Sequence, residues 1–236
     1  MKEIIPRECR VCYASDAQRR TLFRLFRVPF VRENFFLTGG TCLSVFYLSH
    51  RSSEDLDLFL MHEMDLLGHA RLLRVAAGAE RVLAETPGYC SYLCEGGVRV
   101  DFVWDKFSGE GIVKYPLEAD VELNLDVIPN MAANKLCAVV SRFIPRDIVD
   151  LAVLFSTGTL SVADFEGLYR EAARREASLD DLLYVEGLFG EIADAAEQIV
   201  DAIRPALKLE LSGNDVRNVF GRLRTAMRKM RLGRGL

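Results

Sequence analysis

The sequence predicts an α+β protein, in which a half built on a small mixed β-sheet precedes a half built of helices. Short apolar runs bounded by turn residues, which are typical of strands, occur up to about residue 128. From Pro129 onward, apolar residues recur at helical spacing and strand signals are nearly absent. We therefore expect two domains, one over residues 1–128 and a helical one over residues 129–236.

The first domain is expected to begin with a packing helix that ends near Pro29. Its apolar residues are compatible with one helical face: Leu22, Phe23, Leu25, Phe26 and Phe30. Residues 35–38 are then predicted to form a short buried strand, which Gly39 and Gly40 end. Thr41 is predicted to cap a helix that runs to Leu48.

Further elements follow from the same patterns. Residues 55–61 are predicted to form a strand and residues 65–85 a helix, because the latter are rich in Ala, Leu and Arg. Two apolar runs separated by Glu95-Gly96-Gly97 predict a hairpin over residues 89–94 and 98–104. In the second domain, helices are predicted over residues 131–143, 146–155, 162–174, 179–203 and 216–230.

Composition limits the function classes. A chain of 236 residues with 50% apolar content can bury a large core without disulfides, and a net charge of -4 argues against nucleic-acid binding through bulk charge. The charge is uneven, because residues 217–236 contain seven Arg or Lys and no acidic residue. This amphipathic basic helix is either a local contact for RNA phosphates or a solvated face that balances an acidic body.

The location and the cysteine chemistry are constrained in the same way. No run of eighteen apolar residues occurs and the N-terminus lacks the apolar core of a signal peptide, so we expect a cytoplasmic protein with no membrane partner and six reduced cysteines. Three scattered histidines argue against a zinc hydrolase. The spacing of Cys9 and Cys12, with Cys90 and Cys94, leaves a four-thiolate zinc site as an alternative.

The most informative feature is a glycine pair followed by two aspartates at strand spacing. Gly39 and Gly40 lie between a predicted strand and a predicted helix, where the backbone can approach phosphates closely. Asp55 and Asp57 would project from one face of a strand. Each motif alone is weak, since a glycine pair is usually only a turn. Their combination favours a metal-dependent nucleotide site.

The candidate roles follow from the chemistry of a nucleoside triphosphate (NTP). Two Mg²⁺ ions can neutralise a triphosphate and activate an incoming hydroxyl, and they prefer oxygen ligands. Asp55 and Asp57 are the candidate ligands of both ions. Asp101, on the second hairpin strand, is the candidate third catalytic carboxylate and metal ligand, which would complete the ion that activates the acceptor hydroxyl. The candidate phosphate contacts, beside the glycine pair, are Thr41, Arg51 and Ser53, although a charged loop before a strand is ordinarily solvated.

A lysine and a carboxylate in the second half complete the candidate set. Lys135 would place a point charge on the triphosphate, against the alternative of a solvated helix lysine. Asp147 and Asp150 share a helix face and could orient Lys135 or Arg142. Asp150 is the better candidate, because its apolar neighbours indicate burial and a buried carboxylate needs a partner.

Several segments together resemble one known family. Residues 37–44 (LTGGTCLS) and 50–59 (HRSSEDLDLF) resemble the signature of the AbiEii/AbiGii toxin nucleotidyltransferases, a branch of the DNA polymerase β-like superfamily. Residues 134–138 (NKLCA) and 145–151 (PRDIVDL) resemble the family's downstream lysine and its arginine-aspartate helix. The resemblance covers about residues 35–155.

The resemblance implies a palm-like nucleotidyltransferase domain with a helical C-terminal half, acting as the toxin of a toxin-antitoxin or phage-defence pair. By this resemblance, Gly39 and Gly40 correspond to the family's glycine motif, and Asp55 and Asp57 to its metal-binding carboxylates. Lys135 corresponds to the downstream lysine and Asp150 to the final acidic motif.

The same resemblance suggests partners. Some family members add nucleotides to the acceptor end of transfer RNA, so we expect an NTP as substrate, an RNA or protein hydroxyl as acceptor, and a cognate antitoxin. The alternative is a catalytically silent nucleotide-binding or partner-binding module with the same fold. The position of Asp101 discriminates between the two, because catalysis needs a third group that a binding module can lose.

Overall fold

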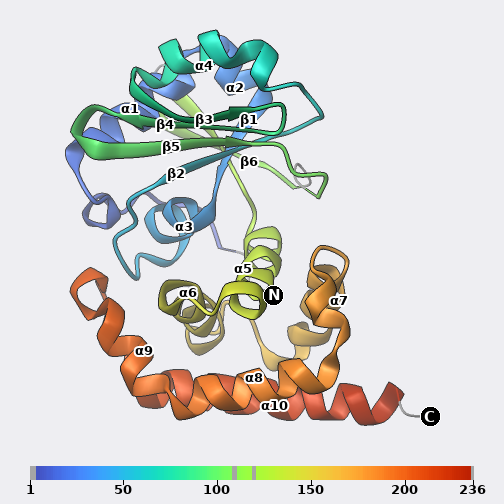
Figure 1. The fold of residues 1–236 in the computed structure, drawn as a ribbon. Coiled ribbons are helices and arrows are strands. Elements are labelled where there is room, and N and C mark those ends of the chain that lie inside the picture. The colour runs from blue at the N-terminus through green and yellow to red at the C-terminus, as the bar shows by residue number, and fades with distance from the viewer. Residues whose placement is uncertain (1–3, 108–110, 119–120, 235–236) are drawn as a thin grey trace. The chain divides into compact units, whose positions relative to one another are not determined.

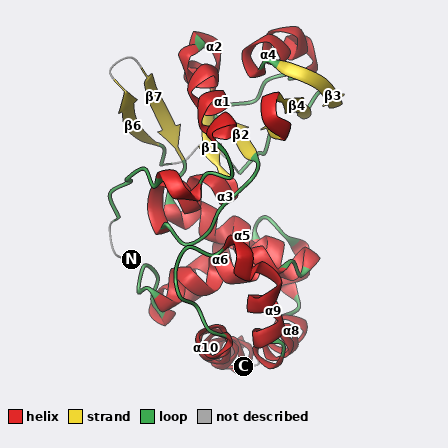
Figure 2. Ribbon diagram, turned by 90° about the vertical axis from the view of Figure 1, so that its left-hand side faces the viewer, coloured by secondary structure: helices red, strands yellow, loops and turns green. Residues whose placement is uncertain are grey.

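The chain folds into two compact units, which we describe from a computed structural model that covers residues 4–107, 111–118 and 121–234. One unit comprises residues 6–130, and the other comprises residues 131–234 with the described residues before Pro6 (Figure 1). All strands of the described ranges lie in the first unit (Figure 2). The α+β class expected from the sequence is confirmed. Within these ranges, no helix has the length and apolar character needed to span a membrane.

A single mixed sheet of seven strands organises the first unit. Its strands stand in the order β3-β4-β5-β2-β1-β7-β6. The pairs β1–β7 and β2–β5 are parallel, and the other neighbours are antiparallel. The strands are β1 (Phe35–Thr38), β2 (Leu56–Leu60), β3 (Ala79–Thr86), β4 (Tyr89–Cys94), β5 (Val98–Val103), β6 (Val113–Glu118) and β7 (Val121–Leu125).

Three helices cover one face of this sheet: α1 (Asp16–Arg27), α2 (Pro29–Asn34) and α4 (Ala70–Ala77) (Figure 1). The core beneath them is aromatic, since the ring of Phe35 packs against Phe30 of α2 and against Phe102 of β5. Leu58 of the central strand is fully buried and pairs in register with Leu37 and Phe102. The apolar residues at alternate strand positions therefore fix which face the helices cover.

Two expectations for the first unit are wrong in their boundaries. The single N-terminal helix is two helices, because the chain is extended at Val28 and Pro29 begins α2. The helix expected over residues 65–85 ends at Ala77, where Gly78 adopts a left-handed conformation, and β3 follows. β3 is a largely exposed edge strand, so its pairing with β4 outweighs a composition that favours helix.

The sequence patterns did not reveal strands β6 and β7. β7 matters most, because it pairs in parallel with β1 and delivers the residues after Leu125 to the end of β1. Its alternation of Val121, Leu123 and Leu125, all buried, is a strand signal that was present in the sequence.

The second unit is helical within the described residues. Its long last helix packs on α8, α6 and α9, and the rings of Phe220 and Phe189 meet edge to face at 5.4 Å. The helix expected over residues 179–203 is wrong as one element, because it is interrupted at Asp181 and Ala195. The helices are α5 (Ile128–Arg142, which begins in the first unit), α6 (Pro145–Ser156), α7 (Phe165–Ala173), α8 (Leu182–Asp194), α9 (Ala196–Ile203) and α10 (Gly213–Arg234).

Short helical turns connect these elements. The 3₁₀ turns are η1 (Arg10–Cys12), η3 (Leu67–His69), η4 (Glu95–Gly97), η5 (Val162–Asp164), η6 (Ala177–Asp180) and η7 (Arg204–Ala206). In the first unit, the four-residue helix α3 (Gly39–Cys42) follows β1 directly and widens into the π-helical segment η2 (Leu43–Leu48). Together α3 and η2 join β1 to the loop that precedes β2.

Candidate functional site

A row of polar side chains crosses the sheet on the face opposite helices α1, α2 and α4. Thr38 of β1 pairs in register with Asp57 of β2, and Asp57 pairs with Asp101 of β5. Asp101 in turn pairs with Ser91 of β4. Residues paired across neighbouring strands project from the same face, so these four side chains form one line. The expected neighbourhood of Asp57 and Asp101 is thus present in the sheet.

Asp101 is anchored at one end of this row. Its Oδ1 accepts hydrogen bonds from Ser91 Oγ at 2.5 Å and from Arg99 Nε at 3.0 Å. These contacts hold the carboxylate beside Asp57 and, together with a bond to Tyr89, raise the pKa of Arg99. Within the described residues, Asp101 Oδ2 makes no hydrogen bond or ion pair. One oxygen is therefore fixed and the other remains for a ligand.

A carboxylate that the sequence patterns did not reveal, Asp126, anchors the other end. Thr38 Oγ1 donates a hydrogen bond to Asp126 Oδ2. The Val127 amide and Asn130 Nδ2 both donate to Asp126 Oδ1, each at 2.8 Å. The side chain is only 1% exposed. Recognition of strand β7 would have identified this residue, because a carboxylate directly after a strand parallel to β1 must lie near the end of β1.

The buried charge of Asp126 affects its neighbours. Burial raises the pKa of the Cys42 thiol well above its usual value, and the Asp126 carboxylate raises it further. Burial likewise raises the pKa of Tyr47, whose hydroxyl donates to the Asp126 backbone carbonyl at 2.7 Å. Both groups are therefore neutral near pH 7 and contribute packing and hydrogen bonds rather than charge.

The glycine turn lies directly against this row. Gly39 has φ +69°, and a Cβ placed there would fall 2.1 Å from Asp57 Oδ2. A Cβ on Gly40 would fall 2.7 Å from Arg51 Nη2 and 2.9 Å from Ser53 Oγ. A side chain at Gly39 would displace Asp57, and the turn brings the backbone, the Asp57 carboxylate and two phosphate-binding side-chain types into one place. Five of the candidate residues expected from the sequence meet here.

Thr41 has a different structural role from the one expected. The helix begins at Gly39 and its N-cap is Thr38, so the expectation that Thr41 is the cap is wrong. Thr41 is fully buried, and its hydroxyl donates to the Asp55 carbonyl at 2.5 Å. Gln18 of α1 donates to the same hydroxyl and to the same carbonyl. Thr41 therefore ties α3 to the residue that begins the Asp55–Asp57 segment.

The carboxylates fit a magnesium ion that completes its shell with substrate. In the described ranges, no three His, Cys, Asp or Glu side chains are placed to hold a metal ion. Neither Asp55, Asp57 and Asp101 nor the four cysteines of the alternative zinc site therefore form a complete protein cage. Mg²⁺ needs no such protein cage, because it commonly binds one or two carboxylates together with phosphate oxygens and water. Asp55 and Asp57 are both half-buried, and the Asp57 carboxylate lies beside the glycine turn, which suits that mode.

Lys135 lies in the second unit, in a buried ionic cluster. Its Nζ is 2.7 Å from Asp147 Oδ1 and 2.7 Å from Asp150 Oδ2, and Arg142 also contacts Asp147. Lys135 is 8% exposed, and both carboxylates are fully buried. The sequence patterns favoured Asp150 over Asp147 as the partner, whereas the structure places both against the lysine. The two carboxylates therefore compensate the charge of this buried ammonium.

Comparisons with known proteins bear on these residues. A family model described as "Nucleotidyl transferase AbiEii toxin, Type IV TA system" matches residues 20–229. A search of curated proteins finds no match. Among solved structures, the crystal structure of JHP933 from Helicobacter pylori is similar with 15% identity, 92% coverage of this chain, 94% of that chain and a TM-score of 0.46.

A second solved structure has a similar level of likeness. MenT4, a nucleotidyltransferase toxin from Mycobacterium tuberculosis H37Rv, matches with 15% identity, 86% coverage of this chain, 82% of that chain and a TM-score of 0.48. The matched family segment includes every candidate site residue named above and begins after the two cysteines that precede α1.

We predict that Gly39→Ala destabilises the first unit. The new methyl group would displace the Asp57 carboxylate and would need a left-handed backbone conformation, which should lower the free energy of unfolding by about 1–3 kcal/mol. Chemical denaturation measures this change. Gly88→Ala is the matched control, since nothing lies within 4 Å of its Cβ position. Equal denaturation midpoints for the two variants would contradict the close approach.

We also predict that Lys135→Met destabilises the helical unit by about 3–5 kcal/mol, because it removes a positive charge from beside two buried carboxylates. Thermal or chemical denaturation again provides the measurement. Lys208→Met, at an exposed position, should have little effect. A Lys135→Met protein as stable as the wild type would show that the lysine does not compensate these charges.

Proposed function

Since the chain belongs to the AbiEii family of nucleotidyltransferase toxins and is therefore a nucleotidyltransferase, we propose that it moves a nucleoside monophosphate from an NTP to an acceptor hydroxyl. The acceptor is RNA, with the end of a transfer RNA as the first choice and a protein hydroxyl as the alternative. The observation that supports this most is the approach of the Gly39–Gly40 turn to Asp57, Arg51 and Ser53.

The glycine turn would hold the triphosphate. Gly39 and Gly40 lack side chains that would keep phosphate oxygens away from the backbone amides. Arg51 and Ser53, whose polar atoms lie against Gly40, would add a charged donor and a hydroxyl. Thr41 would act through its position, because its hydroxyl is directed to Asp55.

Asp55 and Asp57 would hold Mg²⁺, together with the phosphates of the bound NTP. When bound, Mg²⁺ neutralises the triphosphate and makes the acceptor hydroxyl easier to deprotonate. We propose two ions, because these are two separate tasks. Asp101 would contribute its Oδ2, while Ser91 and Arg99 hold Oδ1 and thereby orient the carboxylate. Asp126 would keep Thr38 in place at the other end of the row.

The role proposed for Lys135 on the triphosphate rests on the family to which the chain belongs. Asp147 and Asp150 each lie 2.7 Å from the ammonium nitrogen and would hold this charge in place. A positive charge so held would stabilise the charge that develops on the departing pyrophosphate.

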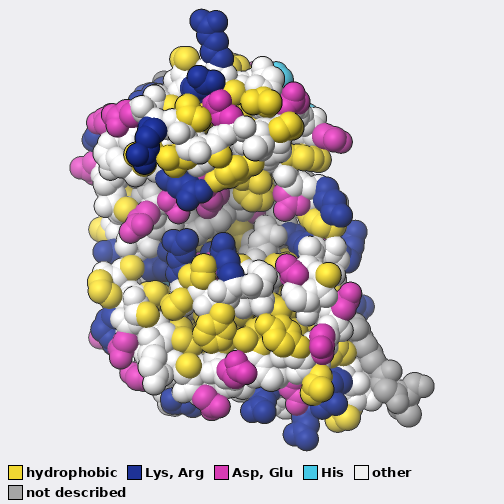
Figure 3. Space-filling view, viewed as in Figure 1, with side chains coloured by type: hydrophobic (Ala, Val, Ile, Leu, Met, Phe, Trp, Pro, Cys, Tyr) yellow, Lys and Arg dark blue, Asp and Glu magenta, His cyan; other side chains and the backbone are white. Residues whose placement is uncertain are grey.

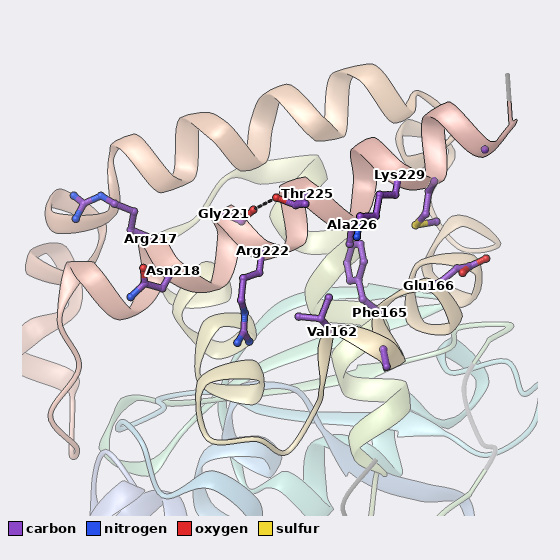
Figure 4. Close-up of a pocket in the computed structure, with 13 residues that line it drawn as sticks. Val162, Phe165, Glu166, Arg217, Asn218, Gly221, Arg222, Thr225, Ala226 and Lys229 are labelled. Carbon is purple, nitrogen blue, oxygen red and sulfur yellow. Dashed lines mark hydrogen bonds between the residues drawn. The ribbon is translucent and has the colours of Figure 1, made fainter.

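A groove in the helical unit supports RNA as the acceptor. Its volume is about 1050 Å³, and it lies between α10 and the segment Val162–Glu166 (Figure 4). Arg217, Arg222 and Lys229 line it from α10, and its one acidic residue, Glu166, is paired with Arg170. Among the described residues, neither Arg222 nor Lys229 has a carboxylate partner, so both remain for phosphates.

The net charge limits where a polyanion can bind. On the face shown in Figure 3, both Lys and Arg side chains and Asp and Glu side chains are present. The formal net charge is -4, so a contact with RNA has to be local. The groove would provide such a contact, since its lining combines the three cations with apolar residues such as Val162 and Met230.

The biological role proposed is that of a toxin with a cognate antitoxin. The matched family model is that of a type IV toxin-antitoxin system. Transfer of a nucleotide to a transfer RNA end would block translation, which suits a toxin. Growth arrest on expression of the wild-type chain, relieved by co-expression of the neighbouring gene, would support this role.

We predict that Asp57→Asn lowers nucleotide transfer about 100-fold or more, because it removes one of the two carboxylate charges that would hold Mg²⁺. Labelled NTPs of each base are incubated with total RNA and with cell lysate, with Mg²⁺ and after chelation. Chelation should abolish transfer and added Mg²⁺ should restore it. Glu54→Gln, at an exposed neighbouring position, should keep activity. Absence of label transfer by the wild type, or equal transfer by Asp57→Asn, would contradict the proposal and favour a binding module.

We predict that Arg222→Gln and Lys229→Gln each weaken RNA binding and each reduce the slope of binding against salt concentration by about one counterion. Titration of labelled RNA at several salt concentrations measures both effects. Arg174→Gln is the control, since this exposed arginine is paired with Glu171 outside the groove. Unchanged slopes in both groove variants would exclude the groove as the RNA contact.

A further inference from the structure

Two thiols lie together in the segment before α1. The Cys12 thiol donates to Cys9 Sγ over an Sγ–Sγ distance of 3.5 Å. Cys9 is half-buried, whereas Cys12 is fully buried at the end of the turn η1. A disulfide requires a separation of about 2.05 Å, so the two sulfur atoms need a small approach rather than a refolding of the segment.

The same segment is hydrogen-bonded to η2 and to Ser53 of the candidate site. The Cys9 amide donates to the Val45 carbonyl of η2 at 2.7 Å, and the Cys12 carbonyl accepts from the Ser53 amide at 3.1 Å. Tyr13 and Ser53 also form an isolated parallel β-bridge. Since Ser53 Oγ lies against Gly40, a change at Cys12 reaches the glycine turn through one residue.

We propose that Cys9 and Cys12 are a modification site, at which a low-molecular-weight disulfide such as glutathione disulfide forms a reversible intrachain disulfide that lowers the affinity for NTP. The formation of the bond is independent of the proposed function, and its effect on NTP rests on that function. Both cysteines precede residue 20, where the family match begins, so the pair is a feature of this chain outside the matched segment.

The chemistry balances with the oxidant alone. The more accessible Cys9, as a thiolate, attacks one sulfur of glutathione disulfide, which releases one glutathione thiolate and leaves a mixed disulfide on Cys9. Cys12 then loses its proton and attacks Cys9 Sγ, and the second glutathione leaves as a thiolate. The two protein thiols lose two electrons and two protons, and the oxidant becomes two molecules of glutathione.

The other cysteines are less suited to this reaction. Cys90 and Cys94 stand four residues apart on β4, where the rise of a strand separates their backbones by about 13 Å, too far for a disulfide. Burial raises the pKa of Cys94 to about 11 and also raises that of Cys42. Cys137 lies in the helical unit, where its thiol contacts the Ala172 carbonyl.

The first test counts thiols in the full-length protein. After incubation with glutathione disulfide and then denaturation, the number of free thiols should fall from six to four, and peptide mapping should find Cys9 joined to Cys12. Cys12→Ser should stop at the mixed disulfide on Cys9, and Cys9→Ser should keep its thiols. Cys137→Ser, the control, should still form the bond. Six remaining thiols in the wild type, or a bond between other cysteines, would overturn the proposal.

The second test measures the coupling to the site. Hydrogen exchange of the peptide that contains Ser53 should rise on oxidation, and the KM for NTP should rise about fivefold, as expected for the loss of one ordinary hydrogen bond. Reduction with dithiothreitol should reverse both, and Cys9→Ser should show neither. Exchange and KM that do not respond to the bond would overturn the coupling. Absence of transfer in both redox states would count against the proposed function, while the thiol count and the exchange still decide this inference.

Discussion

The contact between the Asp57 carboxylate and the Gly39 backbone is the constraint on which the first unit depends. The register of β1 and β2 sets Thr38 opposite Asp57, so the next residue of β1 must let the chain turn beside a carboxylate. Gly39 does so because it has no Cβ and adopts φ +69°. A side chain there would separate β1 from β2 or displace Asp57.

The polar row across the sheet is organised around that contact by fixed partners at both ends. Ser91 and Arg99 hold Asp101, and Thr38 with Asn130 holds Asp126. Carboxylates on a sheet face are costly unless they are hydrogen-bonded, so these partners stabilise the row without a ligand. They also limit the reorganisation that binding requires, since the anchored carboxylates already have defined orientations.

The helical unit treats its charges in two ways. Lys135 is compensated by two buried carboxylates, whereas Arg222 and Lys229 face a groove without a carboxylate partner among the described residues. In the buried cluster, removal of either partner should strongly lower the free energy of unfolding, because it leaves a buried charge without compensation. The second arrangement adds little to stability, because exposed cations contribute mainly through what they bind. A buried lysine such as Lys135 therefore affects mainly stability, whereas a lysine in the groove such as Lys229 would affect mainly binding.

The sequence by itself determined the α+β class, the glycine turn, the strand that contains Asp57 and the family, because these depend on local spacing and on short motifs. Asp126 became recognisable only in the folded chain, since its place beside Thr38 depends on the parallel pairing of β7 with β1. Tertiary structure likewise decided that residues 79–86 are a strand and that Thr41 serves Asp55. Pairing between distant segments outweighs local propensity in each case, and no window of the sequence contains that information.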